Sequence, residues 1–179
     1  MLAVLSLPSP LHPALVHFPI VLLLLGAVVA VPAALITRWK LPLLAAILLS
    51  LGAIGTIVAV QTGESEGERI GETAATEQVM EQHEQWAERT QVVAIVAALL
   101  AAGVLATTRW PKASKALGAV AALGALTVTW CVVETGHYGG QLVYRHGAGV
   151  NLASAGNRGA PDGKPAPERR SGRDHDDRR

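Results

Sequence analysis

Four long apolar runs, separated by polar segments, dominate the pattern of the chain. They cover residues 14–36, 41–62, 90–108 and 115–135. A transmembrane α-helix needs about 20 consecutive apolar residues, and about 17 are tolerated. Because lipid offers no hydrogen-bond partner to the backbone, each run is predicted to be a helix. The pattern therefore predicts an all-α fold, an integral membrane four-helix up-down bundle.

Composition supports lipid as the solvent of this bundle. Charged residues make up 16% of the chain, whereas soluble domains carry about 25%. Residues 1–150 are expected to form the transmembrane domain. Residues 151–179 are rich in Gly, Pro, Arg and Asp without apolar periodicity, which is typical of a disordered polar tail. The one cysteine, Cys131, excludes an internal disulfide and a Cys-rich metal site.

The connections between the runs differ in charge. The two short connections each contain one Trp. Together they hold five basic residues, namely Arg38, Lys40, Arg109, Lys112 and Lys115. The connection 62–91 is long and rich in Glu. The positive-inside rule places the short basic loops in the cytoplasm, so both termini and the 62–91 connection are expected outside. The basic tail argues the other way, but it begins well beyond the last helix.

The two halves of the chain form a weak two-hairpin repeat. Three pairs of segments correspond, namely His12 with His83, Thr37-Arg38-Trp39 with Thr108-Arg109-Trp110, and Thr62-Gly63 with Thr135-Gly136. Each half crosses the membrane twice, so the halves have parallel topology. This arrangement implies a pseudo-two-fold axis along the membrane normal.

Four crossings bring five of the six histidines to one face of the bilayer. These are His12, His17, His83, His137 and His146. His83 lies opposite a stripe of Glu77, Glu81, Glu84 and Glu88, so the third helix is expected to extend out of the membrane with His83 facing the bundle. Gly139 and Gly140 are expected to form a sharp turn that brings His146 back towards the others.

Histidines at one depth predict a cofactor site. Two imidazoles could ligate a haem b iron, and the same histidines could hold copper or zinc. The open alternative is a cofactor-free structural or interaction protein, in which the histidines cap the bundle, bond to one another or sense pH. An enzyme has little support, because the chain has no nucleophile elbow, phosphate loop or HExxH motif. No nucleic-acid partner is expected.

Two segments carry a resemblance to a known family. Leu11-His12-Pro13-Ala14-Leu15-Val16-His17-Phe18-Pro19-Ile20 and Thr135-Gly136-His137-Tyr138-Gly139-Gly140-Gln141-Leu142-Val143-Tyr144-Arg145-His146-Gly147 resemble the opening and closing motifs of a bacterial membrane family, domain of unknown function 2231. The resemblance implies four helices in a bacterial inner membrane and no established activity. Some members are joined to cytochrome c-type domains, which implies cytochrome c-type or quinone redox partners and electron transfer.

Overall fold

The computed structural model describes residues 12–36, 40–67 and 74–148. The helices in these ranges are α1 (His12–Leu15), α2 (His17–Leu35), α3 (Lys40–Gly67), α4 (Ala74–Ala106) and α5 (Pro111–His146). α1 is one turn that leads directly into α2. With α1 and α2 taken together, four helices are long and apolar enough to cross a membrane. The four predicted crossings are therefore confirmed as helices.

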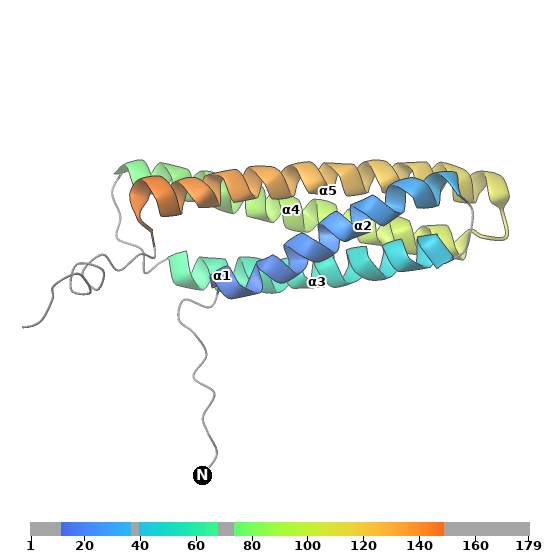
Figure 1. Ribbon diagram of the computed structural model, residues 1–179, viewed down its shortest axis with the longest axis horizontal. Coiled ribbons are helices and arrows are strands. Elements are labelled where there is room, and N and C mark those ends of the chain that lie inside the picture. Colours follow the sequence, from blue (N-terminus) through green and yellow to red (C-terminus); the bar gives the residue numbers. More distant parts are fainter. Residues whose placement is uncertain (1–11, 37–39, 68–73, 149–179) are drawn as a thin grey trace, which may run out of the picture. The chain divides into compact units, whose positions relative to one another are not determined.

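The helices form an up-down bundle. α2 packs on α3, α3 on α4 and α4 on α5, and α2 also packs on α5, which closes the ring. Figure 1 shows that the end of α2, the start of α3, the end of α4 and the start of α5 lie at one end. The opposite end holds α1, the end of α3, the start of α4 and the end of α5. This confirms the all-α bundle and its topology.

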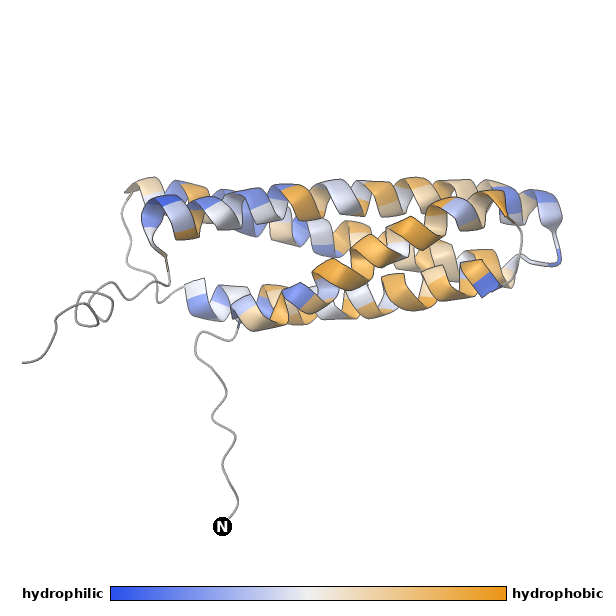
Figure 2. Cartoon of the chain, in the orientation of Figure 1, coloured by the Kyte–Doolittle hydropathy of each residue, from blue (hydrophilic) through white to orange (hydrophobic). Residues whose placement is uncertain are grey.

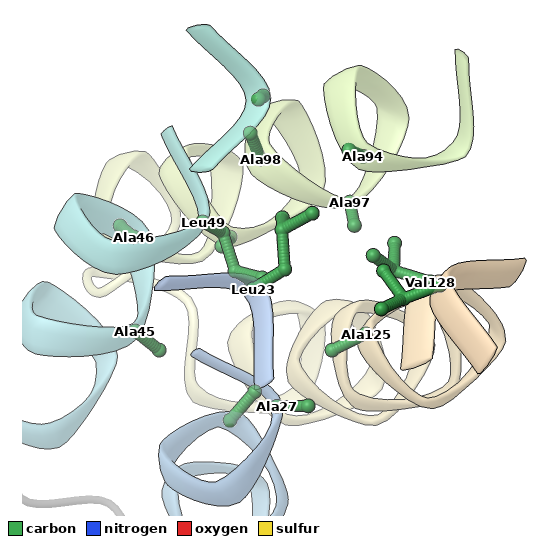
Figure 3. Close-up of a cluster of buried hydrophobic side chains, with 14 residues drawn as sticks. Leu23, Ala27, Ala45, Ala46, Leu49, Ala94, Ala97, Ala98, Ala125 and Val128 are labelled. Atoms are coloured by element: carbon green, nitrogen blue, oxygen red, sulfur yellow. The ribbon is translucent and has the colours of Figure 1, made fainter. Parts of the chain in front are cut away.

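Small residues make the core of the bundle. Most of its buried apolar side chains are alanines, and the largest fully buried ones are Leu23, Leu49 and Val128. Figure 3 shows these three among alanines from α2, α3, α4 and α5. Small side chains let membrane helices approach closely, and the resulting van der Waals contact between the helix backbones stabilises the bundle.

Many of the large apolar side chains point away from the bundle. Examples are Phe18, Val28, Leu99 and Leu123, which are all at least 64% exposed. In water such a surface would be an interaction or aggregation site, whereas in a bilayer it is the surface that contacts acyl chains. Figure 2 shows the apolar colour along the middle of the helices and more polar residues towards their ends.

Helices α3 and α4 reduce the long acidic connection to a short segment. α3 continues to Gly67 and α4 begins at Ala74, so the 62–91 connection between the apolar runs is helical over most of its length. The third helix begins well before its apolar run, as expected, with His83 half-buried against the bundle. Both helices therefore continue beyond the predicted spans on the histidine side.

α5 corrects the expected turn after the fourth apolar run. Gly139 and Gly140 do not form a turn, because α5 continues through both to His146 and ends at Gly147 with φ 65°. A glycine inside a helix costs about 1 kcal/mol relative to alanine. Burial of Leu142 and the fit of a histidine ring against Gly139 offset that cost. The predicted tail, residues 151–179, lies outside the described residues, as do Arg38 and Trp39.

Candidate histidine site

His12 lies at the start of α1 and is bonded to the end of α3. Its ring Nδ1 lies 2.9 Å from the carbonyl oxygen of Ala59 and 3.4 Å from the hydroxyl of Thr62. Its backbone N–H donates to both carboxylate oxygens of Glu66 at 3.3 Å. The first N–H groups of a helix lack partners within the helix, so Glu66 satisfies one of them and fixes where α1 begins.

His83 makes the corresponding bond in the second half of the chain. Its Nδ1 lies 3.0 Å from the carbonyl oxygen of Thr135 on α5. The hydroxyl of Thr135 lies 2.9 Å from that of buried Thr90, which is about two helical turns after His83 on α4. This pair also joins α4 to α5. Each histidine thus bonds to the second long helix of its own half, which gives the weak repeat a structural counterpart.

Two glycines lie directly against these rings. A Cβ built on Gly63 would lie 2.9 Å from Cε1 of His12, and one built on Gly139 would lie 3.1 Å from Cε1 of His83. Real Cβ atoms rarely approach that closely, so any side chain at Gly63 or Gly139 would displace the ring. The glycines therefore allow the imidazoles to approach the helix backbone closely.

The two rings meet each other at this end of the bundle. Their centroids are 6.4 Å apart and their planes are at 89°, an edge-to-face arrangement. A carbonyl oxygen can only accept a hydrogen bond, so Nδ1 of each ring must carry the proton. In the neutral state Nε2 of each ring then carries the lone pair, which is the tautomer that binds metals through Nε2.

His83 lies about 10 Å beyond the predicted span that begins at residue 90, at 1.5 Å per residue. Burial lowers the pKa of His83 below its ordinary value, the bond to the Thr135 carbonyl raises it in part, and the nearby His12 lowers it further. Desolvation penalises the charged form of a buried imidazole. The neutral, lone-pair-bearing form of His83 is therefore favoured.

Acidic residues surround this end of the bundle on α3 and α4. Glu84 lies beside Gly67, where a Cβ would be 3.6 Å from its Oε1. Desolvation raises the pKa of the Glu84 carboxyl, and the negative charges of Glu64, Glu88 and Glu81 raise it further. The histidine pair therefore lies next to a negatively charged surface, which favours positively charged species near it.

The other predicted site residues lie apart from the pair. His17 is exposed, with Nδ1 2.6 Å from the carbonyl oxygen of Pro13. His137 is exposed, bonded to Gln141 at 2.9 Å and edge-on to Tyr138. His146 is half-buried at the last turn of α5. The straight course of α5 through Gly139 and Gly140 removes the turn that was expected to bring His146 back.

The structure thus shows a pair where the sequence predicted a group of five. Within residues 12–36, 40–67 and 74–148, no three His, Cys, Asp or Glu side chains are grouped to hold a metal ion. Sequence reasoning also missed the roles of Gly63, Gly139 and the carbonyl of Thr135. The recurrence of Thr-Gly was a partial signal, because Thr62-Gly63 contains the glycine beneath His12, whereas His83 lies against Gly139, one helical turn beyond Thr135-Gly136.

Comparison with known proteins agrees with this architecture. A family model described as Predicted membrane protein (DUF2231) matches residues 8–152. No curated protein and no solved structure matches the chain. The matched segment includes all five helices and both histidines of the pair. The chain therefore belongs to the DUF2231 family of membrane proteins.

Proposed function

We propose that His12 and His83 are the two protein ligands of one haem b iron or one metal ion, and that the protein transfers electrons at the outer face of a bacterial inner membrane. The observation that carries this proposal is the pair itself. Two imidazoles from different halves of the chain meet at the implied pseudo-two-fold axis, each with Nδ1 tied to a carbonyl. Ligating histidines in metal sites characteristically donate their other ring N–H in this way.

The two rings lie close enough for one ion to be shared between them. Their centroids are 6.4 Å apart, and an imidazole nitrogen would bind a metal at about 2.0–2.1 Å.

Each residue of the site has a distinct part. A haem iron or copper ion would supply a one-electron change between two oxidation states. His12 and His83 would hold it, and the carbonyls of Ala59 and Thr135 would orient the rings and raise the basicity of Nε2. The acidic surface of α3 and α4 suits a positively charged redox partner, such as a cytochrome c-type protein. The quinone pool in the bilayer is the second partner in this proposal.

Spectroscopy of the intact protein tests the proposal. The protein is purified from the membranes of its own host, and a dithionite-reduced minus oxidised spectrum is recorded together with elemental analysis. We expect a haem Soret and alpha band, or copper near one per chain, whereas zinc near one per chain would support metal binding and overturn electron transfer. His12→Ala and His83→Ala should remove the signal, whereas the matched exposed variants His17→Ala and His137→Ala should keep it. Loss on His17→Ala with retention on His83→Ala would overturn the assignment.

A cofactor-free structural role is the second candidate. It is favoured by the ring-to-carbonyl bonds, because each one ties two helices of the same half together without any ligand. In that case the spectrum and the elemental analysis are both silent, and His12→Ala and His83→Ala lower thermal stability only. Measurements on one purified preparation therefore distinguish the two functions.

A further inference from the structure

The carbonyl that holds each histidine ring belongs to the residue four positions before the glycine that the ring lies against. Ala59 precedes Gly63 by four positions, and Thr135 precedes Gly139 by four. A helix carbonyl at position i accepts the backbone N–H of residue i+4, and its second lone pair can accept one more donor. Because residue i+4 is a glycine in both halves, each ring can reach that second lone pair. The position of the carbonyl oxygen therefore decides how each ring is held.

α4 contacts Thr135 of α5 at a second point, through Thr90. The hydroxyl oxygens of Thr90 and Thr135 are 2.9 Å apart, and Thr90 is only 6% exposed. Thr90 lies seven residues after His83, which places both on the same side of α4. In the other half, Thr62 lies near the ring but on the same helix as the carbonyl that holds His12. The support from a neighbouring helix therefore distinguishes the His83 carbonyl from the His12 carbonyl.

The two hydroxyls have two protons for three hydrogen bonds. Besides their mutual contact, the Thr90 hydroxyl lies 2.7 Å from the carbonyl oxygen of Trp86, and the Thr135 hydroxyl lies 2.8 Å from that of Cys131. A carbonyl only accepts, and each hydroxyl donates once. If both protons went to carbonyls, the two hydroxyl oxygens would face each other at 2.9 Å without a proton between them, which is unfavourable in a buried place. One hydroxyl therefore donates to the other, and α4 is bonded to α5 in either arrangement.

We propose that Thr90 is a positioning residue for His83. Its bond to the Thr135 hydroxyl keeps the Thr135 carbonyl oxygen in place to accept from Nδ1–H of His83, so that Nε2 carries the lone pair. Without this bond α5 would be free to shift against α4, and the ring would divide between its Nδ1–H and Nε2–H tautomers. The use of that Nε2 lone pair to bind an ion rests on the proposed function, whereas the tautomer of the ring does not.

Solution NMR of the full-length protein with ¹⁵N-labelled histidine tests this inference. Spectra are recorded in the dithionite-reduced state, and the two rings are assigned from His12→Gln and His83→Gln. In the native protein we expect His83 to be protonated at Nδ1 and not at Nε2. Thr90→Val replaces the hydroxyl by a methyl group of nearly the same size. It should shift the His83 ring nitrogens towards a mixture of the two tautomers and speed solvent exchange of Nδ1–H about fivefold, as expected for one lost hydrogen bond.

Further variants separate positioning from a general loss of stability. Thr90→Ser keeps the hydroxyl and should restore the native His83 signals. Thr135→Val removes the same bond from the other side, so it should reproduce the change, and the double variant should add nothing to it. If Thr90→Val fails to fold, Thr135→Val makes the same test. Thr56→Val is the matched control, because Thr56 is also 6% exposed but donates to a carbonyl of its own helix.

The outcomes for the two rings decide the proposal. The His12 signals should stay unchanged in Thr90→Val, since the His12 ring is bonded to α3. Unmoved His83 signals in both Thr90→Val and Thr135→Val, or an equal shift in Thr56→Val, would overturn the positioning role. The haem or metal content of the same sample is measured separately. A sample with neither would contradict the proposed function alone, because the tautomer of His83 is observed in either case.

Discussion

The side chain of Leu49 lies on the backbone of Gly26, where a Cβ would be 2.8 Å from Leu49 Cδ2. The reverse contact also exists, because a Cβ on Gly52 would be 2.7 Å from Cδ2 of Leu23. Leu23 and Leu49 are 1% and 0% exposed. Each leucine therefore fills the space that a glycine of the facing helix leaves, and α2 and α3 interlock at two reciprocal points.

Alanine at Gly52 is expected to destabilise the bundle. Its methyl group would overlap Leu23, and overpacking of a tight core costs about 1–3 kcal/mol. Thermal unfolding in detergent, followed by circular dichroism, measures the change. Gly136→Ala is the matched control, because a Cβ there meets nothing within 4 Å and alanine is the better helix former. A Gly52→Ala protein as stable as Gly136→Ala would contradict the interlock.

The fold could be predicted from the sequence because the bilayer imposes a simple rule. Uninterrupted apolar runs in lipid must be helices, and an even number of them fixes which ends share a face. The exact ends could not be predicted, because they depend on tertiary contacts. α5 passes through Gly139 and Gly140 since His83 and Leu142 pack there, whereas local propensity alone favoured a turn.

The sequence could predict which membrane face holds the candidate site, but not which residues form it. Topology placed five histidines on one side, but the direction of each ring depends on helix rotation. His17 and His137 turn outward by the same helical geometry that turns His83 inward. His12 turns inward because the end of α3 offers it a carbonyl and a glycine, Ala59 and Gly63, and no pattern in the first helix shows this.

Alanine at Gly139 is expected to move the His83 ring, whereas alanine at Gly140 is not. The new methyl would lie 3.1 Å from Cε1 of His83, so the ring must shift by a few tenths of an ångström. This should weaken the bond to the Thr135 carbonyl and cost about 1 kcal/mol of stability. Solution NMR of ¹⁵N-labelled histidine follows the Nδ1–H signal, which should broaden or shift in Gly139→Ala alone. Identical spectra for both variants would contradict the packing of ring on glycine.

The stability of the protein is expected to rise with pH where His83 titrates. Its pKa is lowered in the folded protein, chiefly by desolvation, so the unfolded chain binds more protons than the folded one between that lowered value and the ordinary value of about 6.5. The contribution of neutral His83 to the stability is therefore fully present above about pH 6.5, and it is lost as the pH falls towards the pKa of His83 in the folded protein. His83→Gln keeps a donor for Thr135 but cannot titrate, so its unfolding temperature should vary less with pH over this window. An unchanged slope would exclude His83 as its source.

Single-cysteine labelling tests the topology on which the histidine site depends. The native Cys131 is 5% exposed, and burial raises its resistance to a charged reagent, so background labelling should be small. A membrane-impermeant maleimide applied to intact cells should label Glu81→Cys, on the exposed side of α4, and should label Lys112→Cys only after permeabilisation. The reverse result would mean that the bundle is inserted the other way, with the histidine pair in the cytoplasm. Labelling of both positions from one side is impossible for a helix α4 that crosses the bilayer once, so that outcome would remove α4 as a crossing and with it the shared face of His83 and Thr135.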